Sequence, residues 1–329
     1  MLKCIHKKKG TKEKERHKMN YKQHFENYIS TITVDKSMTT IANYGNAVRM
    51  FFEYNGFDGE ISTASLLKWR THLSADKGCS ITTINLYIQH MRFFCEYLAA
   101  VEKDFEMPNF QMIAPDKRKV SRERTKEYDH VLTPDEVVEI LCAERPKRCN
   151  SATWPRNKAI LAMFLTGSMR NTELRSVRPC DLDWENGRIR LENTKGGVPR
   201  YAQFSVTARK FVAEYLQSGF RPSVARDDEP LFVTYPMGKP DAYKGFERVA
   251  MSTLVERCVK SILGEDGIRT HALRHASASF MLSNNVPIDE IQKALGHSNI
   301  NTTMIYAKRF QTDSESKKSV FDVAVESCD

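Results

Sequence analysis

The chain of 329 residues, 41% of them hydrophobic and 28% charged, is long enough for two domains that each bury a core. It has no apolar run near the ~20 residues of a membrane span, no apolar segment behind its charged N-terminus and no cysteine pair at zinc spacing. We therefore expect a cytoplasmic protein with reduced cysteines, no metal and no membrane partner. The net charge of +9 is weak evidence for a nucleic-acid partner, because residues 1–20 carry eight Lys/Arg against two Asp/Glu and leave +3 for the other 309 residues.

The N-terminal third of the sequence predicts a helical bundle. Residues 1–20 lack apolar periodicity and are expected to form a disordered basic tail. Over residues 21–114, apolar side chains recur at helical spacing in four segments, which is typical of a compact bundle. The segments are Tyr21–Ile32, Ile41–Phe52, Leu66–Leu73 and Ile84–Leu98.

Two of these predicted helices begin with clusters of hydroxyl side chains. Serine and threonine at such positions are N-caps, because they accept hydrogen bonds from the free N–H groups of the first turn. A second interpretation is contact with DNA phosphates, which helix N-termini also favour. The candidate DNA-binding residues are Thr39, Thr40, Thr82 and Thr83.

Residues 115–130, PDKRKVSRERTKEYDH, are mostly basic and predict an exposed linker or a strap that closes around a duplex. Thr133-Pro134-Asp135-Glu136 then has the pattern of a capping box, so a second domain is expected over residues 131–309. In this domain helical patterns cover 156–165, 206–216 and 243–263, and residues 187–204 predict a hairpin. The expected fold is mainly α with a small β component.

Three nitrogen-bearing side chains share one face near the start of the next predicted helix. Thr270 is expected to cap this helix, and His271, Arg274 and His275 follow at spacings i, i+3 and i+4. Because a helix N-terminus favours an anion, this pattern predicts a phosphate site. Two zinc-binding histidines are the alternative, which the intervening arginine disfavours.

A second candidate group follows the last predicted helix. Pro287 begins that helix, Gly296 ends it and His297 comes directly after the end. Tyr306 lies about two turns into a further short helix, where a tyrosine alone would be interpreted as a packing residue.

Residues 270–308 resemble the C-terminal box of the tyrosine recombinase (phage integrase) family. They contain its His-x-x-Arg, its Leu-Gly-His and a tyrosine nine residues after that histidine. Residues 165–184, LTGSMRNTELRSVRPCDLDW, resemble the first box of the family and match its arginine and acid to Arg170 and Glu173. This box has one residue more between Gly167 and Arg170 than its commonest form. The hairpin lysine of the family corresponds to Lys195.

The resemblance implies a helical core-binding domain, a mixed catalytic domain and a metal-free, ATP-free attack of tyrosine on a DNA phosphate. It implies that the arginines and His297 bind the phosphate, that His271 accepts the proton of the nucleophile, and that the lysine protonates the leaving 5′ oxygen. The resemblance also implies that Glu173 and His275 orient these groups without touching the phosphate themselves. The implied catalytic residues are Arg170, Lys195, His271, Arg274, His297 and the nucleophile Tyr306.

The implied function is site-specific recombination by a homotetramer on two double-stranded DNA sites, with or without accessory DNA-bending proteins. Residues 310–329 form a tail that either docks on a neighbouring subunit or folds back. Three alternatives remain: a type IB topoisomerase-like enzyme, a catalytically silent DNA-binding protein of the same fold, and a metal-dependent nuclease using Asp181 and Asp183. The target DNA stays open.

Overall fold

The protein was analysed as a computed structural model that describes residues 19–120, 132–192, 194, 197–235, 242–297 and 303–304. The chain divides into two compact units, residues 1–127 and 128–329, called here the N-terminal unit and the C-terminal unit. Within the described part of the chain, no helix is both long and apolar enough to cross a membrane.

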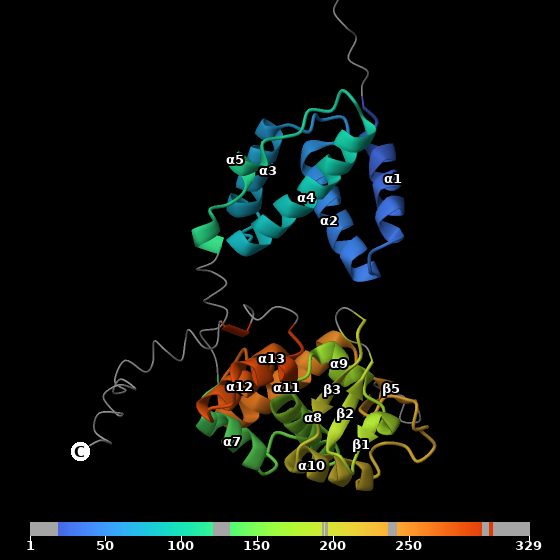
Figure 1. Ribbon diagram of the computed structural model, residues 1–329, viewed down its shortest axis with the longest axis vertical. Helices are drawn as coiled ribbons and strands as arrows, with labels where there is room; N and C mark the ends of the chain where they lie inside the picture. Colours follow the sequence, from blue (N-terminus) through green and yellow to red (C-terminus); the bar gives the residue numbers. More distant parts are fainter. Residues whose placement is uncertain are drawn as a thin grey trace, which may run out of the picture. The chain divides into compact units, whose positions relative to one another are not determined.

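The N-terminal unit is a bundle of helices, in agreement with the predicted periodicity (Figure 1). Helix α4 is the centre of this bundle and contacts each of the other four helices. Its face carries Met91, Phe94 and Leu98, which are buried against Phe51 and Trp69. The helices are α1 (Tyr21–Thr33), α2 (Met38–Asn55), α3 (Thr63–Ala75), α4 (Ile81–Val101) and α5 (Phe110–Ile113).

The hydroxyl clusters cap helices as the sequence predicted. Ser37 accepts a hydrogen bond from the backbone N–H of Thr40 at the start of α2, and Ser80 accepts one from Thr83 at the start of α4. Asn20, at the end of the predicted disordered tail, is itself the N-cap of α1.

Part of the predicted linker is helical. Residues 117–120 form a helical turn and the side chain of Val120 is buried, although no apolar period indicated this. Residues 121–130 of the linker lie outside the described residues, as do residues 1–18 of the tail and 310–329.

The C-terminal unit combines helices with two small antiparallel sheets (Figure 1). One sheet has the strand order β1-β2-β3, and β4 pairs with β5 in the other. The strands are β1 (Leu182–Asp183), β2 (Arg188–Leu191), β3 (Arg200–Gln203), β4 (Val233–Thr234) and β5 (Lys244–Gly245). The helices are α7 (Pro134–Cys142), α8 (Trp154–Gly167), α9 (Asn171–Ser176), α10 (Val206–Gln217), α11 (Arg248–Leu263), α12 (Thr270–Ser283) and α13 (Ile288–Leu295), with a 3₁₀ turn at Pro179–Asp181.

Helix α8 is the core of this unit. It contacts α7, α10, α11, α12 and β3, and it is buried on nearly all sides because residues 159–165 are all apolar and cover its whole circumference. The hairpin expected over residues 187–204 is present as β2 and β3, with Arg190 opposite Tyr201. The helix expected over residues 243–263 was wrong at its start, since Lys244 and Gly245 pair with β4 and helix α11 begins at Arg248.

Candidate active site

The turn after α8 contacts Arg274 and leads directly into Arg170, the two arginines expected to bind the phosphate. Ser168 ends the helix in the left-handed conformation, with φ of 50°, which few residues other than glycine adopt. Its hydroxyl forms a 2.6 Å hydrogen bond with the hydroxyl of Ser277 on α12, and its carbonyl accepts a hydrogen bond from Nη1 of Arg274. Met169, which follows, is fully buried. The extra residue of this box is therefore accommodated by a buried turn, after which Arg170 is the N-cap of α9.

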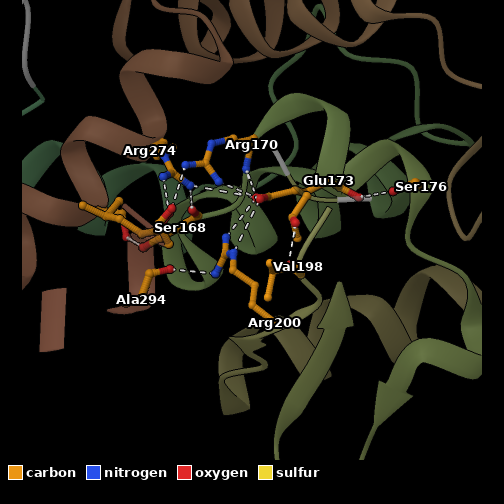
Figure 2. A network of polar contacts seen from close by, with 12 residues as sticks. Ser168, Arg170, Glu173, Ser176, Val198, Arg200, Arg274 and Ala294 are labelled. Carbon is orange, nitrogen blue, oxygen red and sulfur yellow. Dashed lines mark hydrogen bonds and ion pairs between the residues drawn. The ribbon is translucent and has the colours of Figure 1, made fainter. Parts of the chain in front are cut away.

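Glu173 is the centre of the polar network in Figure 2. Its side chain is 0% exposed. Its Oε2 accepts hydrogen bonds from the backbone N–H of Arg170 at 2.6 Å and from Nη2 of Arg200 at 2.9 Å. Its Oε1 accepts from Nη1 of Arg170 at 2.8 Å, and Nη1 of Arg274 lies 3.9 Å from Oε2. Burial by itself would raise the pKa of this carboxyl, but the charge of Arg200 and the hydrogen bonds from Arg200 and Arg170 lower it below its ordinary value. Glu173 is thus an ionised carboxylate on which three arginines converge.

The same three arginines close the C-terminal end of α13. Backbone carbonyls at a helix C-terminus lack partners within the helix and carry partial negative charge. Here three successive carbonyls each accept a hydrogen bond from a different guanidinium. The pairs are Arg200 Nη1 with Ala294 at 2.9 Å, Arg274 Nη2 with Leu295, and Arg170 Nη2 with Gly296 at 3.0 Å.

His297 follows this helix end directly, as predicted. Gly296 adopts φ of 60° at the end of α13, and the His297 ring then contacts the hydroxyl of Thr303 through Nδ1 at 2.9 Å. Burial lowers the pKa of His297 to about 4, and the positive charges of Arg274, Arg170, His271 and Arg200 add to this effect. The ring is therefore neutral at pH 7. When Thr303 donates to Nδ1, the ring proton is on Nε2 and is available to a phosphate oxygen.

The histidines of α12 lie one turn apart. The ring centroids of His271, which is exposed, and His275 are 4.4 Å apart. Burial lowers the pKa of His275 to about 3, with further contributions from His271, Arg274 and His297. The predicted cap was wrong: Arg269 is the N-cap of α12 and has no side-chain capping bond. Thr270 is instead buried, and its hydroxyl is 3.3 Å from Nδ2 of Asn171.

The structure brings together Arg170, Glu173, Arg274 and His297, four of the residues predicted from sequence. Lys195 and Tyr306 lie outside the described residues.

Arg200 was missed by the sequence analysis. The available signal was its place in the hairpin, because strand alternation puts it on the same face as the buried Ala202, where a charged residue requires a partner.

The two aspartates of the nuclease alternative are engaged in local ion pairs. Asp181 accepts hydrogen bonds from Nε and Nη2 of Arg178 at 3.0 and 2.7 Å. Asp183 accepts from the backbone and side chain of Asn186 and from Arg188, and these bonds lower its pKa to about 2. Both carboxylates stabilise the turn around β1, so they do not form an open pair for a reaction.

A helical unit followed by a mixed unit with converging arginines beside a histidine is an arrangement suited to chemistry on a DNA phosphate. Residues 130–312, more than half of the chain, match the phage integrase family. The chain belongs to this family, that of the tyrosine recombinases.

Among curated relatives, tyrosine recombinase XerC of Lactobacillus leichmannii is 34% identical over 154 residues, which cover 46% of this chain and 50% of that protein. The chain thus spans about half the length of the first relatives that it matches. Tyrosine recombinase XerC of Bacillus subtilis (strain 168) is 27% identical over 300 residues, covering 87% of this chain and 92% of that protein.

A likeness of fold extends over both units. The crystal structure of the XerH site-specific recombinase bound to palindromic difH substrate, a post-cleavage complex, has a TM-score of 0.68 and 18% sequence identity. The match covers 91% of this chain and 84% of that chain. At this level of identity the comparison supports the fold alone.

Proposed function

We propose that this chain is a site-specific DNA recombinase that cuts and rejoins DNA through a covalent 3′-phosphotyrosyl intermediate formed by Tyr306. The observation that carries this proposal is the convergence of Arg170 and Arg274 beside His297, with both guanidiniums held by Glu173 and the end of α13. Membership of the phage integrase family agrees with it.

Fixed cations supply the charge that the reaction requires. Attack on a phosphodiester adds negative charge to the non-bridging oxygens in the transition state, and preorganised donors stabilise that charge without reorganising. Arg170 and Arg274 present planar guanidiniums whose orientation is set before DNA binds. Removal of one such donor is expected to slow cleavage on the order of 10²- to 10³-fold.

The proton transfers follow from the resemblance to the family. The Tyr306 oxygen attacks phosphorus, its proton passes to His271, and the bond from phosphorus to the 5′ oxygen breaks. Lys195 donates the proton that the 5′ oxygen needs to leave. Neutral His297 donates to the phosphate. The 5′ hydroxyl of a second strand then reverses these steps, so rejoining needs no ATP.

We also propose that residues 21–114 bind DNA, residues 115–130 link the domains, residues 131–309 are catalytic and residues 310–329 dock on a neighbouring subunit in a tetramer. Thr39, Thr40, Thr82 and Thr83 are proposed phosphate contacts because they lie in the first turns of α2 and α4, which pack against each other. Thr39→Ala with Thr82→Ala should weaken DNA binding. Thr71→Ala, at an exposed position of α3, should leave it unchanged.

The central test is covalent capture. DNA bound by the chain is first selected from a random library and then prepared as a duplex nicked beside each phosphate in turn, so that the short 5′ hydroxyl strand is lost after cleavage. Wild-type protein in EDTA should form an adduct that denaturing gels resolve. Tyr306→Phe should abolish the adduct, and Arg274→Lys should slow it on the order of 10²-fold or more.

Arg190→Lys is the matched control, since Arg190 is exposed on β2 and pairs with Glu192 at 3.3 Å. Tight DNA binding without any adduct would show a catalytically silent DNA-binding protein. Relaxation of supercoiled DNA that lacks the selected site would instead show a topoisomerase-like activity.

A further inference from the structure

Arg200 connects Glu173 on α9 with the end of α13, two parts of the site that Arg170 also connects. Arg200 lies at the start of β3, and its side chain is 14% exposed. Nη2 donates to Oε2 of Glu173 at 2.9 Å, while Nη1 donates to the carbonyl of Ala294 at 2.9 Å (Figure 2). A single guanidinium thus joins α9 to the end of α13.

We propose, on the basis of the proposed function, that Arg200 is a positioning residue for strand transfer, which fixes Glu173 and the end of α13 so that Arg170, Arg274 and His297 face the phosphate together. It acts through these neighbours and is not itself a group that touches the DNA.

The contacts with Glu173 give the first argument. The charged groups that face this carboxylate are Arg170 on its own helix, Arg200 on β3 and Arg274 on α12, while α13 presents its last carbonyls and then His297. The charge of Arg200 is the largest influence that opposes the effect of burial on Glu173. Without Arg200, burial raises the pKa of Glu173. The carboxyl then takes up a proton at a higher pH, and the ion pair with Nη1 of Arg170 and the charge-assisted bond from the backbone N–H of Arg170 are weakened.

The packing at Gly296 gives the second argument. A Cβ atom at this glycine would lie 2.8 Å from Cδ and from Nε of Arg200. The Arg200 side chain therefore lies flat against the backbone at the residue directly before His297. Loss of this side chain frees the turn that sets the position of the His297 ring.

The geometry also requires an arginine at this position. Three nitrogens of one planar group donate to two different elements: Nε and Nη2 donate to Glu173 at 3.4 and 2.9 Å, and Nη1 donates to the carbonyl of Ala294 at 2.9 Å. A lysine ammonium is a point charge and lacks this fork, so it can restore the charge near Glu173 without restoring all three bonds.

The experiment measures single-turnover adduct formation on the selected nicked duplex. Arg200→Met should slow the reaction about 10- to 100-fold, the usual effect of losing a group that orients ligand-binding residues. The affinity for DNA should stay within about threefold, because the phosphate-binding arginines remain. Arg200→Lys should recover part of the rate. Arg190→Met is the matched control on the neighbouring strand, where the side chain is 58% exposed, and should react at the wild-type rate.

The pH profile separates positioning from a general loss of structure. In the wild-type protein Glu173 stays ionised down to its low pKa, so a fall of the cleavage rate above that pH comes from other groups, such as the proposed proton acceptor His271. In Arg200→Met the rate should fall at a higher pH, since the pKa of Glu173 rises. Adding Glu173→Gln to Arg200→Met should remove this shift. Arg200 comes last among the charges that lower the pKa of His297, so the histidine contributes little to the shift.

Hydrogen exchange of residues 288–295 gives a measurement that does not depend on cleavage. Arg200→Met should speed exchange in α13, whereas exchange in the N-terminal unit should be unchanged. A wild-type rate and wild-type exchange in Arg200→Met would overturn the proposal, and so would a slower rate with an unshifted pH profile. Failure of the wild-type protein to form any adduct would count against the proposed function instead, and exchange in α13 would still decide whether Arg200 positions this helix end.

Discussion

Replacing Glu173 with glutamine removes the carboxylate on which Arg170, Arg200 and Arg274 converge. Each carboxylate oxygen accepts one hydrogen bond from a nitrogen of Arg170 and one from a nitrogen of Arg200, at 2.6 to 3.4 Å. Whichever oxygen becomes the NH₂ group, two of these four bonds are lost and the new donor faces two other donors, of which at least one is a guanidinium nitrogen. We expect Glu173→Gln to destabilise the C-terminal unit strongly.

The magnitude follows from the burial and charge of the group. A hydrogen bond to a charged partner contributes about 1.5–3 kcal/mol, so the loss of two costs about 3–6 kcal/mol. Removal of one member of a buried ion pair costs a similar ~3–5 kcal/mol, because it leaves buried charge without compensation. At about 1.4 kcal/mol for each factor of ten, the loss raises the population of the opened unit by roughly two orders of magnitude or more.

Hydrogen exchange measured by mass spectrometry reads this unit separately from the N-terminal one. Peptides from α8, the buried core of the C-terminal unit, report its global opening. Glu192→Gln is the control, since Glu192 is 42% exposed and pairs with Arg178 and Arg190 at the surface. It should change the free energy of opening by less than about 0.5 kcal/mol. Equal exchange of α8 peptides in the two variants would refute the network as the source of stability.

Three further predictions concern the residues around this network. Gly264 ends α11 in the left-handed conformation with open space around it, so Gly264→Ala should lower the free energy of urea unfolding by about 1–2 kcal/mol. Gly296→Ala should lower it more, because the new Cβ would also meet Arg200. Equal losses in the two variants would contradict that contact. Ser168→Ala should destabilise the protein by about 1–3 kcal/mol, because the buried hydrogen bond with the hydroxyl of Ser277 is lost. Ser168→Gly should destabilise it less, because glycine adopts the positive φ without strain. The reverse order of the urea midpoints would contradict this. The pKa of His297 is about 4 in the folded protein, so the unfolded chain takes up a proton that the folded chain does not, and stability should fall as pH drops from about 6.5 to about 4. Thermal midpoints across this range should show a flatter slope in His297→Gln, and an unchanged slope would count against the lowered pKa.

Helices and their ends were predictable where the signal is local. The capping box at Thr133 and Glu136 is present, and Ser37 and Ser80 cap the helices that their positions predicted. Capping depends on residues three apart, so the sequence contains both partners. The predicted cap at Thr270 was wrong because its hydroxyl has a distant partner: it accepts a hydrogen bond from Asn171, which lies 99 residues earlier in the chain.

The candidate residues were found through short motifs, and their roles through the resemblance to a family. Neither source indicated Arg200, whose partners are 27 and 94 residues away at Glu173 and Ala294. The helical pattern after Pro287 and the glycine that follows it predicted that Gly296 ends a helix. They gave no reason why an arginine of a hairpin should lie against that glycine.

The sequence alone therefore determined the helical bundle, the hairpin, the helix ends with local caps and the identity of the charged groups, because these depend on periodicity and on neighbours within a turn. The tertiary structure decided which arginine meets which acceptor. Three guanidiniums satisfy one buried carboxylate and three successive carbonyls only after α8, α9, α12, α13 and β3 have packed. The physical reason is that burial removes water as a partner, so each charge must find another from a distant part of the chain.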